Sequence, residues 1–318
     1  MEVRFWGTRG SLPASLSAQH VREKVRGALE AAIEAGLRPG EDLERFMDDR
    51  LPFWKRATYG TNTSCIEIRD GKHFILCDAG TGLRDFGNHV MGLYEPDRPR
   101  NFHLILSHLH WDHIQGFPFF TPALVKGNKI TIYGCHANLK KAFSVQQSAP
   151  FFPVEFKGLD ATIRFVQLKP GVETEIEGFK VTPMEQNHPG KSFGYRFKRK
   201  GKVVIYSTDA EHKNEREKDM APFTKFFKGA DLLIFDAQYT FADAVTVKED
   251  WGHSNNLVGV EMAKKAKVKH LCLYHQDPNS TDQELDRLLE DTRKLARLLR
   301  GNENMAVSIA WDGMILKV

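Results

Sequence analysis

Apolar and polar residues alternate with a two-residue period through most of the first two thirds of the chain. This alternation, together with enrichment in β-branched residues, is typical of half-buried strands. Twelve strands are expected on this basis: 3–6, 63–69, 74–78, 102–107, 129–133, 162–168, 180–185, 192–197, 203–207, 232–236, 270–274 and 305–309.

Helical periodicity interrupts these strands in five places. The expected helices are 18–35, 41–49, 138–147, 255–265 and 281–299. Sheets with helices packed outside them are the natural solution for this succession, so the pattern predicts an α+β fold. The chain has no Pro- or Ser-rich linker, internal repeat or low-complexity tract, and residues 1–318 are therefore expected to form a single domain.

Residues of about 15–57 stand apart because they are helical and charged between short strands. They are interpreted as a helical insertion near the N-terminus. A surface addition is favoured over a substrate lid. Its apolar side chains would either cover a pocket or anchor the insertion on the body; these are Phe46, Met47, Phe53 and Trp54.

Composition excludes some functions. The 318 residues are 41% hydrophobic, but no apolar run is long enough to span a bilayer and no export signal opens the sequence, so a cytoplasmic location without a membrane partner is expected. The net charge of +4 comes from interspersed basic and acidic residues, which is poor evidence for a nucleic-acid groove. Structural thiols are expected at the four separated cysteines, Cys65, Cys77, Cys135 and Cys272.

The strongest chemical indication is the segment Ser107-His108-Leu109-His110-Trp111-Asp112-His113, which follows an apolar strand. A core rarely tolerates so many polar side chains together. In an extended segment His108 and His110 point the same way and can hold one ion, while Asp112 and His113 project toward a second position after the chain turns. Imidazole and carboxylate favour zinc, with iron or manganese as alternatives.

Other ligand-type residues end later strands. Asp78 closes one apolar run, and Asp209, His188 and His275 each follow another. Taken singly, each side chain has the alternative of a capping or turn role. Together they repeat one arrangement, in which an apolar strand delivers a polar side chain at its carboxyl end, where active sites of layered folds gather.

The ordered set Asp78, His108-x-His110-x-Asp112-His113, His188, Asp209 and His275 resembles the metallo-β-lactamase superfamily, in the branch of the transfer-RNA 3′-processing endonucleases and related phosphodiesterases. The resemblance runs from Arg4-Phe5-Trp6-Gly7-Thr8-Arg9-Gly10 nearly to the C-terminus, except for the insertion. It implies a four-layer αββα sandwich with a dinuclear site at one edge.

The resemblance also implies a role for each residue. His108, His110 and His188 would hold one ion, and Asp112, His113 and His275 the other, with Asp209 bridging the two ions and the ions sharing a hydroxide. Asp78 would orient a ligating histidine. The expected catalytic residues are Asp112, Asp78 and His253. Histidine at position 110, where di-iron relatives carry glutamate, points to hydrolysis with zinc.

The element Trp251-Gly252-His253-Ser254 resembles the Gly-His-Ser/Thr element of the RNA-processing and phosphodiesterase branch, in which the histidine lies near the scissile phosphate. A loop residue before a helix capped by Ser254 is the structural alternative for His253. The family usually continues with threonine, whereas this chain has Asn255.

Substrate choice rests on weaker features. The chain shows no Gly- and Pro-rich arm of the kind that grips RNA in the long processing enzymes, and the basic run at 198–202 is interpreted as a hairpin turn. The segments 4–10 and 59–64 resemble cyclic-nucleotide phosphodiesterases. A small phosphodiester, 3′,5′-cyclic nucleotides first, is therefore expected, without stable nucleic-acid binding. The alternatives are an RNA 3′-end endonuclease, a thioester or lactone hydrolase, and a non-enzymatic sensor. Relatives in this branch also allow a homodimer.

Overall fold

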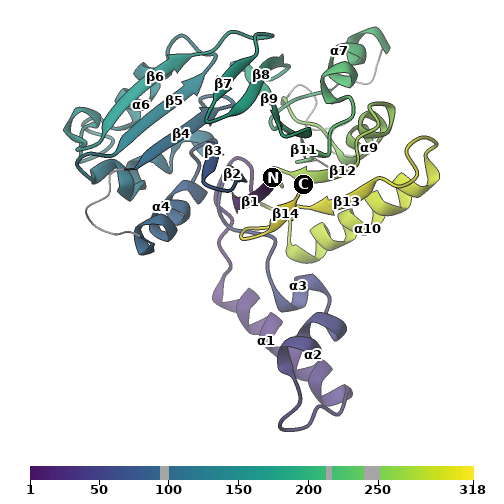
Figure 1. Ribbon diagram of the computed structural model, residues 1–318. Coiled ribbons are helices and arrows are strands. Elements are labelled where there is room, and N and C mark those ends of the chain that lie inside the picture. The colour runs from purple at the N-terminus through teal and green to yellow at the C-terminus, as the bar shows by residue number, and fades with distance from the viewer. Residues whose placement is uncertain (94–99, 213–216, 240–250) are drawn as a thin grey trace.

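Two sheets packed face to face form the body of the protein, and a helical arm projects from it (Figure 1). The structure is a computed structural model that describes residues 1–93, 100–212, 217–239 and 251–318. In the described residues each sheet has seven strands, in the orders β14-β1-β2-β3-β4-β5-β6 and β13-β12-β11-β10-β9-β8-β7.

The first sheet combines antiparallel and parallel strands. Strands β14, β1, β2 and β3 pair antiparallel, whereas β3, β4, β5 and β6 pair parallel. Its strands are β1 (Glu2–Gly7), β2 (Cys65–Asp70), β3 (His73–Cys77), β4 (Asn101–Leu106), β5 (Lys129–Gly134), β6 (Thr162–Gln167) and β14 (Ile315–Lys317).

The second sheet repeats this plan. Strands β7, β8, β9 and β10 pair antiparallel, and β10, β11, β12 and β13 pair parallel. Its strands are β7 (Thr174–Ile176), β8 (Phe179–Gln186), β9 (Ser192–Arg199), β10 (Lys202–Ser207), β11 (Leu232–Asp236), β12 (His270–Tyr274) and β13 (Ala306–Ile309).

Helices cover the outer face of each sheet. Those of the first sheet are α4 (Gly82–Gly92), α5 (Trp111–Ile114) and α6 (Leu139–Gln146), with 3-10 turns at Phe117–Phe119, Thr121–Leu124 and Phe156–Gly158. Those of the second are α7 (Glu217–Phe227), α9 (Asn256–Lys265) and α10 (Asp282–Leu298). The layers are therefore α, β, β and α, as expected.

Three apolar clusters hold the layers together. The inner cluster joins both sheets, with Phe5 and Ile105 from the first and Tyr206 and Ile234 from the second. The two outer clusters lie between each sheet and its helices. Burial of these side chains supplies the main favourable free energy of folding. All four cysteines are free and buried, as expected for structural thiols.

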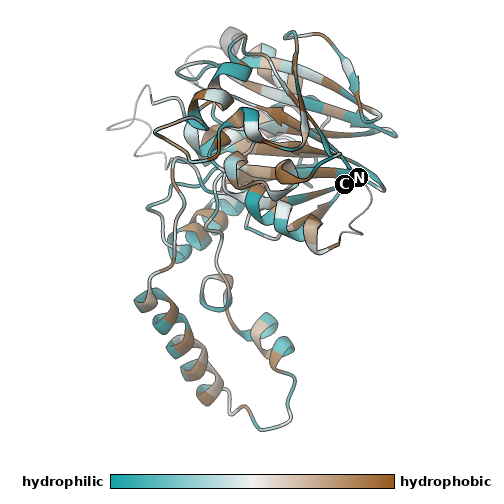
Figure 2. Cartoon of the chain, turned by 90° about the vertical axis from the view of Figure 1, so that its left-hand side faces the viewer, coloured by the Kyte–Doolittle hydropathy of each residue, from teal (hydrophilic) through white to brown (hydrophobic). Residues whose placement is uncertain are grey.

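The expected insertion is an arm of three helices, α1 (Ala18–Glu34), α2 (Leu43–Arg50) and α3 (Phe53–Arg56). Figure 2 shows α1 and α2 standing clear of the sheets. Phe53 anchors the arm, because its ring packs 4.6 Å from that of Tyr59 and 5.4 Å from that of Trp311, centroid to centroid. Phe46 and Met47 are partly exposed.

All twelve expected strands and five expected helices are present, within about two residues at most ends. The sequence pattern did not predict the short strands β7 and β14 or the helices α3, α4, α5 and α7. Among the described residues, no helix has both the length and the apolar character needed to cross a membrane.

Candidate metal centre

The polar side chains predicted at strand ends meet at one edge of the two sheets. His108 comes two residues after β4, His188 two residues after β8, Asp209 two residues after β10, and His275 directly after β12. Because β10, β11 and β12 run parallel, their carboxyl ends lie side by side. The fold therefore gathers residues that are as much as 167 positions apart in the sequence.

Three of these strand ends adopt a left-handed backbone conformation. Asp78, Asp209 and His275 have φ values of 61°, 33° and 61°. This region is uncommon for residues other than glycine and costs free energy that the surrounding structure must offset. Such turns redirect each side chain out of the strand and toward the shared edge.

One group of possible ligand atoms comes from His108, His110 and His188, whose ring nitrogens lie within 4.8 Å of one another. Nε2 of His188 lies 3.1 Å from Nδ1 of His110. Burial, followed by the charge of neighbouring histidines, keeps the pKa of His108 well below its ordinary value. Neutral imidazoles with free lone pairs are the form that binds a metal ion.

A second group consists of Asp112, His113, Asp209 and His275, all buried, with ligand atoms again within 4.8 Å. Nε2 of His113 and Nε2 of His275 are 3.1 Å apart, and each lies 3.2 Å from Oδ2 of Asp112. Burial would raise the pKa of Asp112, but the charge and hydrogen bond of His113 outweigh it and lower that pKa. Asp112 is therefore held as a carboxylate.

The two oxygens of Asp209 face different groups. Oδ2 lies 3.5 Å from Nε2 of His108 and 3.7 Å from Nε2 of His188. Oδ1 lies 3.2 Å from Nε2 of His113 and 3.2 Å from Nε2 of His275. One carboxylate thus stands between both groups, which is the placement required of a bridging ligand.

These residues fit two divalent ions. Nε2 of His108 is buried and has no hydrogen-bond partner among the described residues. Buried polar atoms are normally paired, and a lone imidazole nitrogen aimed at a carboxylate oxygen is well satisfied by a cation between them. The nitrogen and oxygen donors suit zinc, and also iron or manganese.

A buried network orients His113. Oδ2 of Asp78 lies 2.7 Å from Nδ1 of His113 and accepts a 2.6 Å hydrogen bond from the Tyr206 hydroxyl. Asp78 also accepts hydrogen bonds from the backbone N–H and hydroxyl of Ser107, both at 2.7 Å. A carboxylate on Nδ1 fixes the tautomer and leaves Nε2 free to bind a metal. Asp78 therefore lies where the sequence predicted an orienting residue, while Tyr206 was not foreseen.

Asp236 is a second residue that sequence reasoning missed. It ends β11, is fully buried, and has a carboxylate oxygen 2.9 Å from Nδ1 of His253. Burial would lower the pKa of His253, but the charge and hydrogen bond of Asp236 outweigh it and raise that pKa. The pattern that marked Asp78 and Asp209, an apolar strand ending in aspartate, would also have found Asp236.

The Gly252-His253-Ser254 element ties several parts of the site together. The carbonyl oxygen of Gly252 accepts a 2.8 Å hydrogen bond from Nδ1 of His188. Gly252 has φ of +85°, and a Cβ at this position would lie 2.4 Å from that same nitrogen. Ser254 donates a hydrogen bond to the Ala210 carbonyl, beside Asp209. His253 lies between the two groups, with its ring centroid 5.2 Å from those of His188 and His275.

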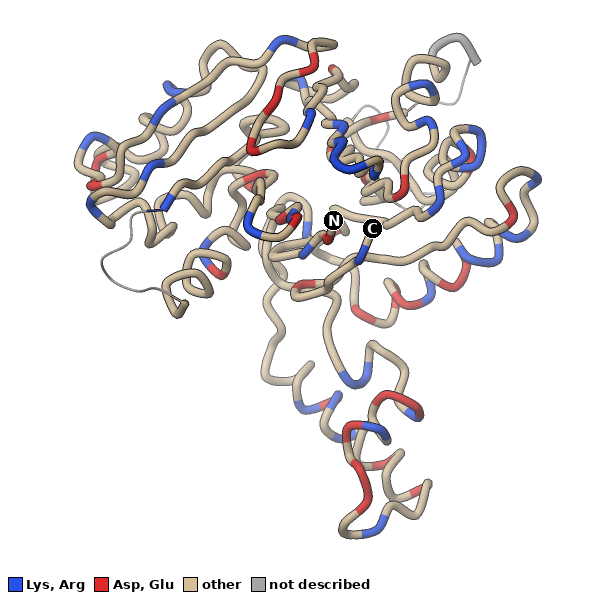
Figure 3. The backbone as a smooth tube through the Cα atoms, in the orientation of Figure 1, with Lys and Arg blue, Asp and Glu red and all other residues tan. Residues whose placement is uncertain are grey.

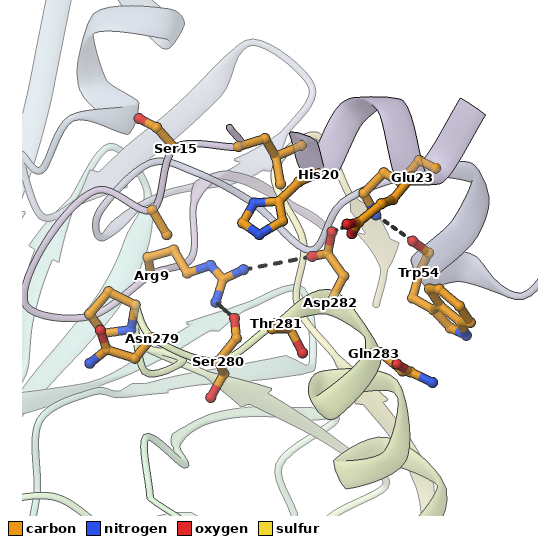
Figure 4. Close-up of a pocket in the computed structure, with 14 residues that line it drawn as sticks. Arg9, Ser15, His20, Glu23, Trp54, Asn279, Ser280, Thr281, Asp282 and Gln283 are labelled. Carbon is orange, nitrogen blue, oxygen red and sulfur yellow. Dashed lines mark hydrogen bonds and ion pairs between the residues drawn. The ribbon is translucent and has the colours of Figure 1, made fainter. Parts of the chain in front are cut away.

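A cavity of about 280 Å³ lies at the base of the arm, and Arg9 is one of the residues that line it (Figure 4). Arg9 is buried and donates hydrogen bonds to the carbonyls of Asp277 and Ser280. Lys24 of α1 crosses to Asp282 at the start of α10, with Nζ 2.7 Å from a carboxylate oxygen. Trp54 lines this cavity. The cavity thus borders the joint between arm and body and includes none of the candidate ligands.

The family model described as "Beta-lactamase superfamily domain" matches residues 73–276. Ribonuclease Z of Oenococcus oeni is 24% identical over 61% of this chain and 74% of its own. Ribonuclease Z of Archaeoglobus fulgidus is 22% identical over 79% of this chain and 93% of its own.

Among solved structures, the metallo-β-lactamase fold protein YhfI from Bacillus subtilis superimposes with a TM-score of 0.63, at 19% identity, over 99% of this chain and 98% of its own. This likeness confirms the predicted fold. The family model spans more than half of the residues and includes every member of both groups of candidate ligands. The chain therefore belongs to the β-lactamase superfamily and is a metal-dependent hydrolase of the metallo-β-lactamase fold.

Proposed function

We propose that the protein hydrolyses phosphodiester bonds at a centre of two divalent ions, most naturally zinc. His108, His110 and His188 would hold one ion, Asp112, His113 and His275 the other, and Asp209 both. The observation that carries this proposal is the division of the Asp209 carboxylate between the two groups of histidines. When bound, such an ion pair lowers the pKa of water and neutralises phosphate charge.

The chain's own residues supply the rest of the chemistry. Asp236 holds Nδ1 of His253, so that Nε2 of His253 remains available to carry a proton. The charge and hydrogen bond of Asp236 raise the pKa of His253, which favours a ring that carries a proton. We assign His253 as the group that protonates the departing oxygen, a role worth about 10²–10⁴-fold in rate. The buried Asp236 keeps this ring in one orientation.

RNA is the first candidate substrate, cleaved in 3′-end processing. Both relatives reported above are named ribonuclease Z, and the alignment with this chain covers most of each of them. This reverses the order expected from sequence, in which small cyclic nucleotides came first. The names also weigh against the expectation that stable nucleic-acid binding is absent.

Hydrolysis of 3′,5′-cyclic nucleotides is the second candidate. The arm, residues 15–57, carries eight basic and eight acidic residues, and Figure 3 shows both charges interspersed along it. Phosphate contacts that grip RNA rest on an excess of lysine and arginine. Because the arm has no net positive charge, it favours a small substrate that is bound only at the metal centre.

One set of assays separates these classes. Metal-loaded protein is offered a precursor transfer RNA, 3′,5′-cyclic nucleotides, bis-p-nitrophenyl phosphate and a thioester. The proposal expects turnover of bis-p-nitrophenyl phosphate and of one natural phosphodiester. RNA cleavage that weakens steeply with salt would support the first candidate, whereas salt-insensitive turnover of the cyclic nucleotide would support the second. Thioester turnover without any phosphodiester turnover would refute both.

A further inference from the structure

Helix α1 carries an apolar stripe on its outer side. Val21, Val25, Leu29 and Ile33 follow one another at four-residue intervals, so they line one face of the helix. Their side chains are 48%, 54%, 59% and 79% exposed. In Figure 2 apolar turns recur along the free length of α1. A contiguous apolar row on a projecting helix is typical of an interaction surface.

A row of charges runs beside this stripe and changes sign halfway. Arg22 and Arg26 lie in the first half of α1, and Glu30 and Glu34 in the second half, again at four-residue intervals. All four are exposed. Within one chain only Arg26 and Glu30 approach each other, at 3.8 Å. The row therefore presents positive charge near the body and negative charge toward the tip.

The opposite side of α1 is committed to the body and the rest of the arm. Lys24 pairs with Asp282, and Gly27 is buried beside the Lys55 side chain, 3.6 Å from the position of a Cβ. The stripe and its charged row are consequently the side of the helix that remains open. A partner that binds this surface must present an apolar stripe. Beside it, the partner must place negative charge opposite Arg22 and Arg26 and positive charge opposite Glu30 and Glu34.

A second α1 helix meets both requirements when it runs antiparallel about a twofold axis. Such an axis places the charged rows of the two helices next to each other on one side of the pair. The two rows then run in opposite directions. Arg22 then faces Glu34 of a second copy, and Arg26 faces Glu30. A parallel pair would instead set Arg22 and Arg26 against the other flank of the stripe, the row of His20, Lys24 and Ala28, which holds no carboxylate to pair with them. Self-complementary patches of this kind generate twofold dimers.

We propose that two copies of this chain associate through their arms by antiparallel pairing of α1. The helix is about 25 Å long at 1.5 Å per residue. Each arm tip then lies at the base of the other arm, and the two bodies lie at opposite ends of the helix pair. The interface is independent of the metal centre, so it stands or falls separately from the proposed function.

Sedimentation velocity of the full-length protein from about 1 to 100 µM tests the pairing. Wild type is expected to pass from monomer to dimer across this range. A variant with Arg22→Glu and Arg26→Glu has an all-acidic row, and one with Glu30→Arg and Glu34→Arg has an all-basic row. Each should self-associate at least about tenfold more weakly, because four like-charged pairs replace four opposite ones. An equimolar mixture of the two should restore a 1:1 dimer.

A further pair of variants controls for apolar surface and folding. Val25→Glu with Leu29→Glu should remain monomeric alone and in every mixture, while Val172→Glu, at an exposed apolar residue outside the arm, should dimerise as wild type does. Circular dichroism and hydrolysis of bis-p-nitrophenyl phosphate verify that each variant is folded. A monomeric wild type at 100 µM, a dimer that survives in the Val25/Leu29 variant, or a mixture that stays monomeric would each overturn the proposal.

Discussion

Nδ1 of His253 lies 2.9 Å from a carboxylate oxygen of the fully buried Asp236. This contact fixes the tautomer of His253, holds its ring between the rings of His188 and His275, and raises its pKa against the effect of burial. The same arrangement recurs at Asp78 and His113, 2.7 Å apart. Two buried aspartates thus orient two histidines at one sheet edge: His113, which we propose as a metal ligand, and His253, which we propose as the proton donor.

Replacement of His253 tests the proton-transfer role. His253→Ala should lower turnover of a phosphodiester about 10²–10⁴-fold while both metal equivalents are retained. Asp236→Asn should lower turnover less, because the ring remains but is no longer held in one tautomer. Turnover is measured alongside metal content. If metal content fell in step with activity in His253→Ala, His253 would be a ligand rather than a proton donor.

Loss of the Tyr206 hydroxyl should weaken metal binding without removing a ligand. Tyr206→Phe leaves Asp78 with fewer donors and frees it to move away from His113, so metal affinity should fall about 10–100-fold. Tyr195→Phe is the matched control, because its buried hydroxyl donates to the Leu106 carbonyl at 2.7 Å. Both variants should lose about 1 kcal/mol of stability. Competition with a chelator measures affinity, and equal affinities in the two variants would contradict the role of Tyr206.

A methyl group at Gly252 should disturb His188 directly. The added Cβ of Gly252→Ala would lie 2.4 Å from Nδ1 of His188, at a backbone with φ of +85°. Gly229→Ala carries the same left-handed backbone strain, φ +64°, with no atom within 4 Å. Both variants should be destabilised by about 1–3 kcal/mol. Only Gly252→Ala should lose one of the two metal equivalents, and loss of metal in both would point to general unfolding instead.

The protein should lose stability in mild acid through His212. This buried ring packs against Phe223 and Phe235, and burial lowers its pKa to about 4. The unfolded chain binds a proton near pH 6.5 whereas the folded chain does not, so stability falls as pH decreases from 6.5 toward 4. The loss amounts to about 3 kcal/mol. Urea unfolding of metal-loaded wild type and His212→Leu at pH 7 and 5 should show a smaller acid loss in the variant, and equal losses would refute this assignment.

The sequence was most informative where burial imposes a simple period. Strands β10, β11 and β12 were expected because their residues are apolar and β-branched in short runs, and the His108–His113 motif stood out because such residues are rarely packed together. Helix α4 was missed because it contains Gly82, Gly87 and Gly92, which oppose helical propensity. The structure explains Gly82, since a Cβ there would lie 2.5 Å from the Trp6 backbone.

Other features depend on contacts that a single sequence does not encode locally. Strands β7 and β14 have only three residues, too few to show alternation, and they form by pairing at the sheet margins. The hydrogen bond from the Tyr206 hydroxyl to Asp78 joins residues that are 128 positions apart in the sequence. The arm was expected as a helical insertion, but its projection from the body and its stripe of exposed apolar side chains became clear only in three dimensions.

Metal stoichiometry, measured with hydrolysis of bis-p-nitrophenyl phosphate on the same samples, tests the central claim most directly. Apo-protein prepared with a chelator is titrated with zinc and assayed for bound metal per chain, with Asp209→Ala as the comparison. Wild type should bind two equivalents and reach full turnover only with the second, whereas Asp209→Ala should fail to hold a complete pair and be inactive. A single tight equivalent that supports full turnover, or full turnover in Asp209→Ala, would contradict a two-ion centre bridged by Asp209.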